Sequence, residues 1–203
     1  MRVLFALFLT VSFLYGSSIK RCELYKTSER VSHEAVFGLD FPWYYGMGQI
    51  QQESLCRNVL SNDGVGSQGI AQITMSVWGS FLAKKGIHGL KTTQNQTRSQ
   101  AEIMKTQFDQ SVNKKLWVAY QIYNGGGLVN KEIKTASKVY GTPITLITHD
   151  QAKIFCKRKI IKFNNGQTIS ACEINYDYST KVYNYGNKYN LFETNNSSKF
   201  KYY

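Results

Sequence analysis

The sequence is short of acidic residues, and it lacks the patterns that mark most metal sites. Lysine and arginine number 25 against 13 aspartates and glutamates, which gives a formal net charge of +12. The four cysteines form no Cys-x-x-Cys pair, and His33-Glu34 lacks the second histidine of a zinc-protease motif. We therefore expect no metal site. The surplus of positive charge favours an anionic partner, either a wall polymer or a nucleic acid.

Long apolar runs are absent after the N-terminus. Residues 1–18 carry Arg2, then an apolar stretch at residues 3–15, then three small residues, which is the layout of a secretory signal peptide. The apolar stretch is too short to span a bilayer comfortably. We expect a removed signal, with an uncleaved signal-anchor as the alternative, and no integral membrane domain in the mature chain. Export argues against a nucleic acid partner.

Export also favours disulfides at the four cysteines, because the periplasm is oxidising. Four cysteines allow three pairings, which the sequence alone does not decide. We favour Cys156 with Cys172, because residues 157–163 and 167–174 read as two strands joined at residues 164–166, an Asn-Asn-Gly turn. That choice leaves Cys22 with Cys56.

Helical periodicity dominates the rest of the chain, so the expected fold class is mainly α (α+β) with a small C-terminal β-hairpin. A Ser-x-x-Glu cap at Ser99 followed by a long apolar stripe predicts one continuous helix over residues 101–123, stopped by the glycines at 125–127. Other helices are expected around residues 43–54, 70–83, 129–140 and 178–189, with a cap at Thr148. We divide the chain into a signal (1–18), a helical domain (19–145), a disulfide-linked hairpin and helix appendage (146–193) and a flexible tail (194–203).

Residues 64–69 fit the Gly-x-Gly-x-x-Gly pattern of dinucleotide-binding proteins, but their surroundings do not. That motif follows a strand and precedes an acidic residue by about twenty positions. Here a helix precedes the glycines, and no acidic residue lies between Gly69 and Arg98. We expect no cofactor.

Three ordered blocks carry the strongest functional signal. Each combines glycines or apolar residues with polar side chains that can contact a substrate. They are residues 48–54, which end in Glu53-Ser54, residues 66–72, which end in Gln72, and residues 120–127, which contain Tyr123-Asn124.

In this order the blocks resemble the lytic transglycosylase family, lysozyme-like enzymes that cut bacterial cell-wall glycan. The phage-type branch is the most similar, because its Tyr-Asn-Gly-Gly is likewise followed by Val-Asn, here Val129-Asn130. Gln72 follows Glu53 by nineteen positions, one more than the family pattern, and an insertion in the loop at residues 61–64 would explain the difference. The resemblance covers about residues 30–140 and implies a lysozyme-like helical domain.

The resemblance also implies a reaction. Glu53 would protonate the leaving oxygen of the β-1,4 bond between N-acetylmuramic acid and N-acetylglucosamine, and would then act as base while the substrate's own C6 hydroxyl attacks, which gives a 1,6-anhydro product. A carboxyl group is an acid near neutral pH only if burial raises its pKa. The uncharged run before Glu53 fits such burial.

The matching positions around Glu53 are expected to bind substrate: Ser54, Gln72, Tyr123 and Asn124. Asp63 lies where the family often has a serine. It could position a water and make the enzyme a hydrolase, although an aspartate in an Asn-Asp-Gly turn more often bonds its own backbone.

Together these features predict an exported, periplasmic enzyme that acts as a monomer, without cofactor, on peptidoglycan glycan strands. Two alternatives stay open. One is a hydrolytic muramidase that uses the same acid. The other is a non-catalytic wall-binding protein that assists lysis, which the loss of the acid would favour.

Overall fold

The computed structural model describes residues 19–61, 66–162 and 166–190. The fold is mainly α, with two small antiparallel strand pairs, β1 with β2 and β3 with β4. The elements are α2 (Lys26–Phe37), α3 (Tyr44–Ser54), β1 (Ser67–Gln68), β2 (Ile73–Thr74), α4 (Met75–Lys84), α5 (Thr93–Gln110), α6 (Leu116–Gly125), α7 (Leu128–Tyr140), the 3₁₀ turn η1 (Ile144–Leu146), α8 (His149–Lys153), β3 (Ile160–Lys162), β4 (Thr168–Ser170) and α9 (Ala171–Tyr189).

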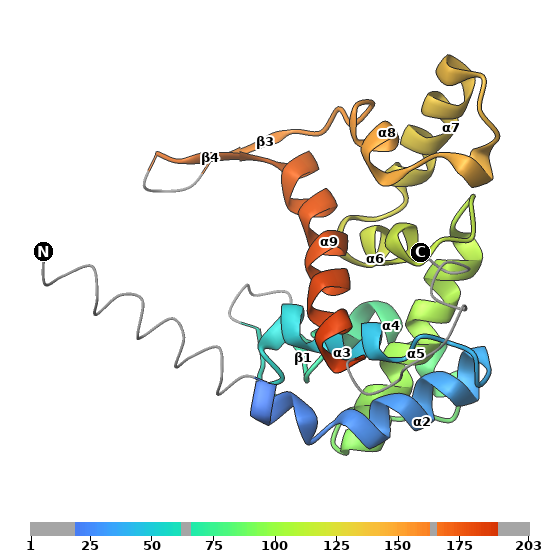
Figure 1. The fold of residues 1–203 in the computed structure, drawn as a ribbon. Coiled ribbons are helices and arrows are strands. Elements are labelled where there is room, and N and C mark those ends of the chain that lie inside the picture. The colour runs from blue at the N-terminus through green and yellow to red at the C-terminus, as the bar shows by residue number, and fades with distance from the viewer. Residues whose placement is uncertain (1–18, 62–65, 163–165, 191–203) are drawn as a thin grey trace, which may run out of the picture.

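Helix α9 runs through the middle of the molecule and connects its two ends (Figure 1). It packs on α3 and on α6, while α2 lies against α5 and α7 against α8. The β3–β4 hairpin projects away from the start of α9. Tyr178, Val182 and Tyr189 of α9 belong to the larger of two buried apolar clusters, and Tyr176 belongs to the smaller. Helix α9, which the sequence assigns to the C-terminal appendage, thus contributes to the main core. The limits of the domains stay a prediction.

Two glycines let α3 and α9 approach closely. A Cβ atom on Gly48 would lie 2.2 Å from the carbonyl oxygen of Val182, and one on Gly186 would lie 2.5 Å from Cδ1 of Tyr45. Only glycine fits where two backbones meet at such a distance. This contact sets how α9 lies along the helix that carries Glu53.

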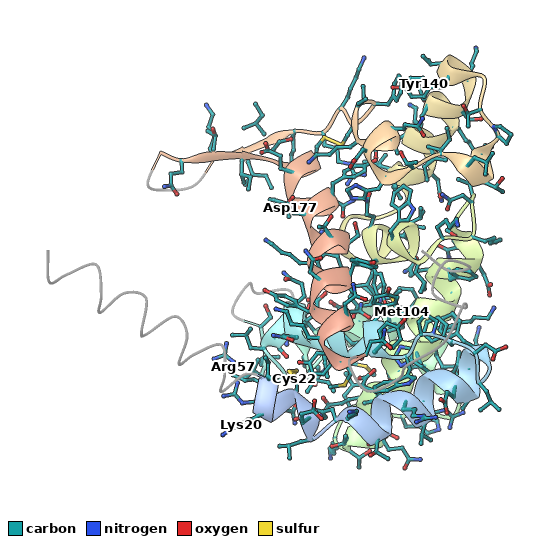
Figure 2. All side chains as sticks on the ribbon, in the orientation of Figure 1. Lys20, Cys22, Arg57, Met104, Tyr140 and Asp177 are labelled. Carbon is teal, nitrogen blue, oxygen red and sulfur yellow. A yellow bond between two sulfur atoms is a disulfide. The ribbon has the colours of Figure 1, made fainter. Side chains whose placement is uncertain are left out.

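The end of α3 is fixed by backbone conformation and by a disulfide. Leu55 and Cys56 both adopt left-handed conformations, with φ of 54° and 58°, and their N–H groups donate to the carbonyls of Gln51 and Ile50. Left-handed backbone is unfavourable for residues other than glycine. The bond from Cys56 to Cys22 holds this end against the N-terminal part of the described chain, near Arg57 in Figure 2.

The structure has both disulfides that the sequence favoured, Cys22 with Cys56 and Cys156 with Cys172. Two disulfides are compatible with an exported protein.

Within the described ranges, no helix combines the length and the apolar character that a bilayer crossing requires. The expected signal at residues 1–18 and the expected tail at 194–203 lie outside the described residues.

One expected helix is in fact two. The prediction of a continuous helix over residues 101–123 is wrong, because α5 ends at Gln110 and α6 begins at Leu116. Lys114 takes a left-handed φ of 53°, and the side chain of Asn130 accepts from the N–H of Val112 and donates to the carbonyl of Gln110, both at 3.1 Å. The apolar stripe continues across the break because both helices bury residues in the same core.

Other helix starts also differ from the expectation. Helix α5 begins after Thr92, whose hydroxyl accepts from Asn95, so Ser99 is a buried residue inside the helix and not its cap. Helix α4 begins at Met75, because residues 67–74 form the β1–β2 pair. The expected cap at Thr148 and the helix ended by Gly141 are confirmed.

The C-terminal hairpin is confirmed, but it is shorter than expected. Ile161 pairs with Ile169 in an antiparallel register, and the expected turn at residues 164–166 falls mostly on residues 163–165, which lie outside the described part of the chain. The second strand ends at Ser170, whose side chain accepts from the backbone of α9 while Glu173 bonds back to the backbone of Ser170. This capping box starts α9 at residue 171, seven positions before the expected start at 178.

Candidate functional site

Glu53 lies in the last turn of α3, and its carboxyl group is half-buried. The hydroxyl of Tyr178 donates a hydrogen bond to Oε1 of Glu53. Burial raises the pKa of Glu53 from 4.5 to about 7, and the bond from Tyr178 lowers it in part. Desolvation disfavours the charged form of a carboxyl group, so Glu53 is partly protonated near neutral pH. It can therefore give up a proton and take it back.

Tyr178 reaches Glu53 from α9, 125 residues further along the chain. It follows Asp177, which Figure 2 labels on that helix. The ring is buried, and burial, followed by the charge of Glu53, raises the pKa of the hydroxyl well above 10. Tyr178 therefore stays a proton donor to the carboxylate at neutral pH. The sequence analysis placed Tyr178 in a helical stripe only, and no local pattern marks it as a site residue.

The turn at residues 69–72 lies beside Glu53, and α3 and α5 hold it by polar contacts. The hydroxyl of Ser54 donates to the carbonyl of Ile70 at 2.8 Å. Gln96 of α5 accepts from the N–H of Ile70 at 2.9 Å and donates to the carbonyl of Leu90 at 2.8 Å. Gly69 lies against this amide, since a Cβ there would be 2.8 Å from Oε1 of Gln96. Ser54 is thus buried and engaged with protein, and Gln96 is a positioning residue that the sequence analysis missed.

Helix α6 provides the third contact to the same turn. The hydroxyl of Tyr123 donates to the carbonyl of Ala71 at 2.5 Å. Burial raises the pKa of Tyr123 well above 10, and the charge of Glu53 raises it further. The two side chains are therefore close enough to interact electrostatically. Tyr123 thus lies near Glu53, as the sequence predicts, but its hydroxyl donates to the carbonyl of Ala71 and not to the carboxylate.

Gln72 ends the turn in a left-handed conformation with φ of 51°. Its amide nitrogen donates to the carbonyl of Gly69 at 2.7 Å and to that of Val59 at 3.1 Å. The amide group therefore braces the loop, and its carbonyl oxygen makes no hydrogen bond that the described residues supply. That oxygen is the part of Gln72 that can accept from a substrate.

Asn124 is exposed at the end of α6, and its amide nitrogen donates to Asn175 of α9 at 3.0 Å. Asn175 in turn donates to Gln121 at 3.3 Å. The loop that contains Asp63 lies outside the described residues. The roles of Ser54, Gln72, Tyr123, Asn124 and Asp63 in binding substrate stay predictions.

A second carboxyl group, fully buried, packs against the first turn of α3. Glu29 and His33 of α2 are both fully buried, with 3.1 Å between Oε2 of Glu29 and Nδ1 of His33. They pack on Gly46, where a Cβ would lie 2.4 Å from the histidine ring. Burial raises the pKa of Glu29, and His33 lowers it in part. His33 is thus one half of a buried pair.

The site contains one carboxyl group whose pKa lies near neutral pH, so it can both donate and accept a proton. Burial and Tyr178 are the causes of the shifted pKa of Glu53, and no described carboxylate contributes to it. In the part of the chain that the structure describes, no group of three or more histidines, cysteines, aspartates or glutamates could hold a metal ion. No protein-family model, curated protein or solved structure matches this chain.

Proposed function

We propose that this protein is a peptidoglycan lytic transglycosylase, which cleaves the β-1,4 bond between N-acetylmuramic acid and N-acetylglucosamine. The observation that carries the proposal is the placement of Glu53 at the end of α3, where Tyr178 bonds its carboxylate and the neighbouring Ser54 bonds the turn at residues 69–72. Burial raises the pKa of Glu53 to about 7. General acid catalysis is most effective when the pKa of the acid is close to the working pH. The resemblance of the three sequence blocks supplies the substrate.

In the proposed reaction Glu53 gives its proton to the glycosidic oxygen as the bond from that oxygen to C1 of the muramic acid breaks. The C6 hydroxyl oxygen of the same sugar then bonds to C1, and its proton returns to Glu53. No water is consumed, and the product carries a 1,6-anhydro ring. Most glycosidases use a second carboxylate as nucleophile or base. The resemblance implies a mechanism without a second carboxylate, and Asp63, which the hydrolytic alternative would use, lies outside the described residues.

The proposal includes the positions of the neighbouring side chains. Tyr178 holds one carboxylate oxygen of Glu53 and stabilises the charged form after proton transfer. Tyr123 and Ser54 hold the turn at residues 69–72, so that its backbone and the free oxygen of Gln72 form one wall for the sugar. The net charge of +12 favours approach to a wall polymer that carries carboxylates. The compartment that we propose is the periplasm, because both disulfides suit an oxidising space.

Mass spectrometry of soluble products from purified peptidoglycan tests the proposal. Anhydro and reducing ends differ in mass by one water, so the product distinguishes the two kinds of enzyme. We expect anhydro ends from the wild-type protein and none from Glu53→Gln. Reducing ends would identify a hydrolytic muramidase, and no soluble product from a folded protein would favour the non-catalytic alternative.

A further inference from the structure

A cavity of about 360 Å³ lies between α7 and the segment that follows α8, outside the site described above. Its polar lining includes Lys131, Glu132, Lys157 and Arg158. Tyr140, labelled at the end of α7 in Figure 2, marks this part of the molecule. We refer to this cavity as the α7 pocket.

The α7 pocket carries a net positive charge. Glu132 is the acidic residue of its lining, and Arg158 binds it through Nε at 3.0 Å and Nη2 at 3.1 Å. The hydroxyl of Tyr176 donates to the same carboxylate at 2.6 Å. Lys131 and Lys157 are exposed, and neither forms an ion pair with a described residue. Glu132 is thus neutralised within the protein, and two lysine charges remain for a ligand.

The rest of the lining consists of Leu128, Phe155 and Thr135, whose hydroxyl donates to the carbonyl of Lys131 at 2.9 Å. Leu128 is 55% exposed, and Phe155 is half-buried with its ring edge-to-face on Tyr140, 5.7 Å between centroids. The disulfide from Cys156 to Cys172 ties the segment between Phe155 and Lys157 to the first turn of α9. Two ammonium groups above an apolar wall suit a carboxylate on a short, weakly polar chain.

The pocket is connected to the candidate site through Gly125. A Cβ on Gly125 would lie 2.5 Å from Oδ1 of Asn175 and 3.0 Å from Nη1 of Arg158. Asn175 accepts from Asn124, one of the expected substrate-binding residues. The guanidinium of Arg158, which lines the pocket, therefore lies near Gly125, the residue that follows Asn124.

We propose that the α7 pocket binds a carboxylate of the short peptides that peptidoglycan carries on its muramic acid. This inference rests on the proposed function, because it assigns a second contact to the same substrate. The enzyme would then prefer glycan that still bears its peptides over glycan from which they have been removed. Lys131 and Lys157 are the specificity residues, and Arg158 with Glu132 keeps the pocket in shape.

The test uses peptidoglycan, the same material after an amidase has removed its peptides, and the free peptides that the amidase releases. The pocket variant combines Lys131→Glu with Lys157→Glu. The control variant combines Lys134→Glu with Lys153→Glu, which makes the same change in charge at exposed lysines of α7 and α8 that do not line the pocket. Two quantities are measured on the full chain: the affinity for the free peptides by calorimetry, and the ratio of product release from intact and stripped material.

We expect the wild type and the control variant to bind the peptides, and the pocket variant to bind them about tenfold more weakly, since it loses two charge-assisted contacts. The ratio of rates on intact and stripped glycan should fall to about one in the pocket variant only. Equal peptide affinity in the pocket and control variants would overturn the inference, as would a wild type that does not bind the peptides. Stronger competition by inorganic phosphate than by acetate at equal ionic strength would also overturn it. Peptide binding that depends on the pocket, in a protein that releases no glycan product, would refute the proposed function alone.

Discussion

Two carboxyl groups lie near opposite ends of α3, and burial raises the pKa of both. Glu29 packs on Gly46 with His33 beside it, and both side chains are fully buried. Glu53 lies at the end of the same helix, half-buried, with Tyr178 as its partner. The two groups share a physical cause for their raised pKa but differ in access and in partner.

Those differences separate a structural carboxyl group from a candidate acid. Glu29 and His33 are both fully buried, so neither the carboxyl group nor the ring beside it is open to a substrate. Tyr178 is held neutral, because burial and the charge of Glu53 raise its pKa well above 10. It donates a hydrogen bond to the carboxylate but does not neutralise the charge of that group. A raised pKa therefore indicates burial, and only access and a neutral partner indicate a group that can exchange a proton with a substrate.

The largest expected effect contrasts the two carboxyl groups directly. Glu53→Gln keeps the shape of the side chain but removes its transferable proton, so activity should fall by about 10²- to 10⁴-fold. Glu29→Gln should keep most of the activity at low temperature, because the side chain of Glu29 is fully buried beside His33 and packs against Gly46 at the start of α3. Clearing of a cell-wall suspension measures both. Wild-type rates in Glu53→Gln, or equal losses in the two variants, would remove the distinction.

The next effect tests the contact that brings Tyr178 to Glu53. Gly48→Ala places a Cβ 2.2 Å from the carbonyl oxygen of Val182, and the backbone of α9 must move to accept it. We expect a loss of about 2 to 3 kcal/mol in the free energy of unfolding, together with lower activity.

Gly79→Ala is the matched control for Gly48→Ala. Its Cβ would meet only Cε of Met75, at 3.7 Å, which is ordinary contact. Alanine is the better helix former, so this variant should gain about 0.5 to 1 kcal/mol. Urea unfolding measures both variants, and equal stability of the two would contradict the close approach of α3 and α9.

The pH dependence of stability is a smaller effect. Glu53 has a higher pKa in the folded protein, about 7, than its ordinary value of 4.5, so the folded state binds the proton more tightly. Its contribution to stability is complete below pH 4.5 and is lost as the pH rises to about 7. Compared with Glu53→Gln, the wild type should lose up to about 3 kcal/mol across this window.

Subtracting the two unfolding curves at each pH isolates this effect, because both proteins contain Glu29 and its titration cancels. A difference that is constant from pH 4 to pH 8 would mean that the carboxyl group of Glu53 is not desolvated. A wild-type stability that falls, relative to Glu53→Gln, as the pH is lowered would contradict the sign of the shift.

The smallest expected effect concerns Tyr178. Tyr178→Phe removes a hydrogen bond to the charged form of Glu53, so the pKa of Glu53 should rise further. The alkaline limb of the activity profile should move to higher pH by the same amount. Tyr183→Phe removes a hydroxyl from the same helix, where the ring stacks on Tyr45 at 5.5 Å, and should leave the limb in place. A limb that moves to lower pH in Tyr178→Phe would contradict the hydrogen bond.

The parts of the fold that depend on neighbouring residues could be predicted from the sequence. Apolar periodicity located α3 and α7, Gly141 ended α7, and the Asn-Asn-Gly signal located the β3–β4 hairpin. The hairpin in turn indicated the pairing of Cys156 with Cys172. Periodicity failed at residues 111–115, because two helices that bury one face in a common core give the same stripe as a single helix.

The sequence by itself determined the helical class and the hairpin and favoured the pairing of its cysteines, because these depend on residues close together in the chain. The candidacy of Glu53 came from the order of three blocks along the sequence. Tertiary structure alone decided that Tyr178 meets Glu53, that Gln96 holds the turn beside it and that Glu29 pairs with His33 out of reach of solvent. Helix packing produces these contacts, and packing depends on how whole surfaces fit. Gly48 and Gly186 illustrate the reason. Glycine within a helix lowers the stability of that helix, and only the packed structure shows that these two positions have no room for a side chain.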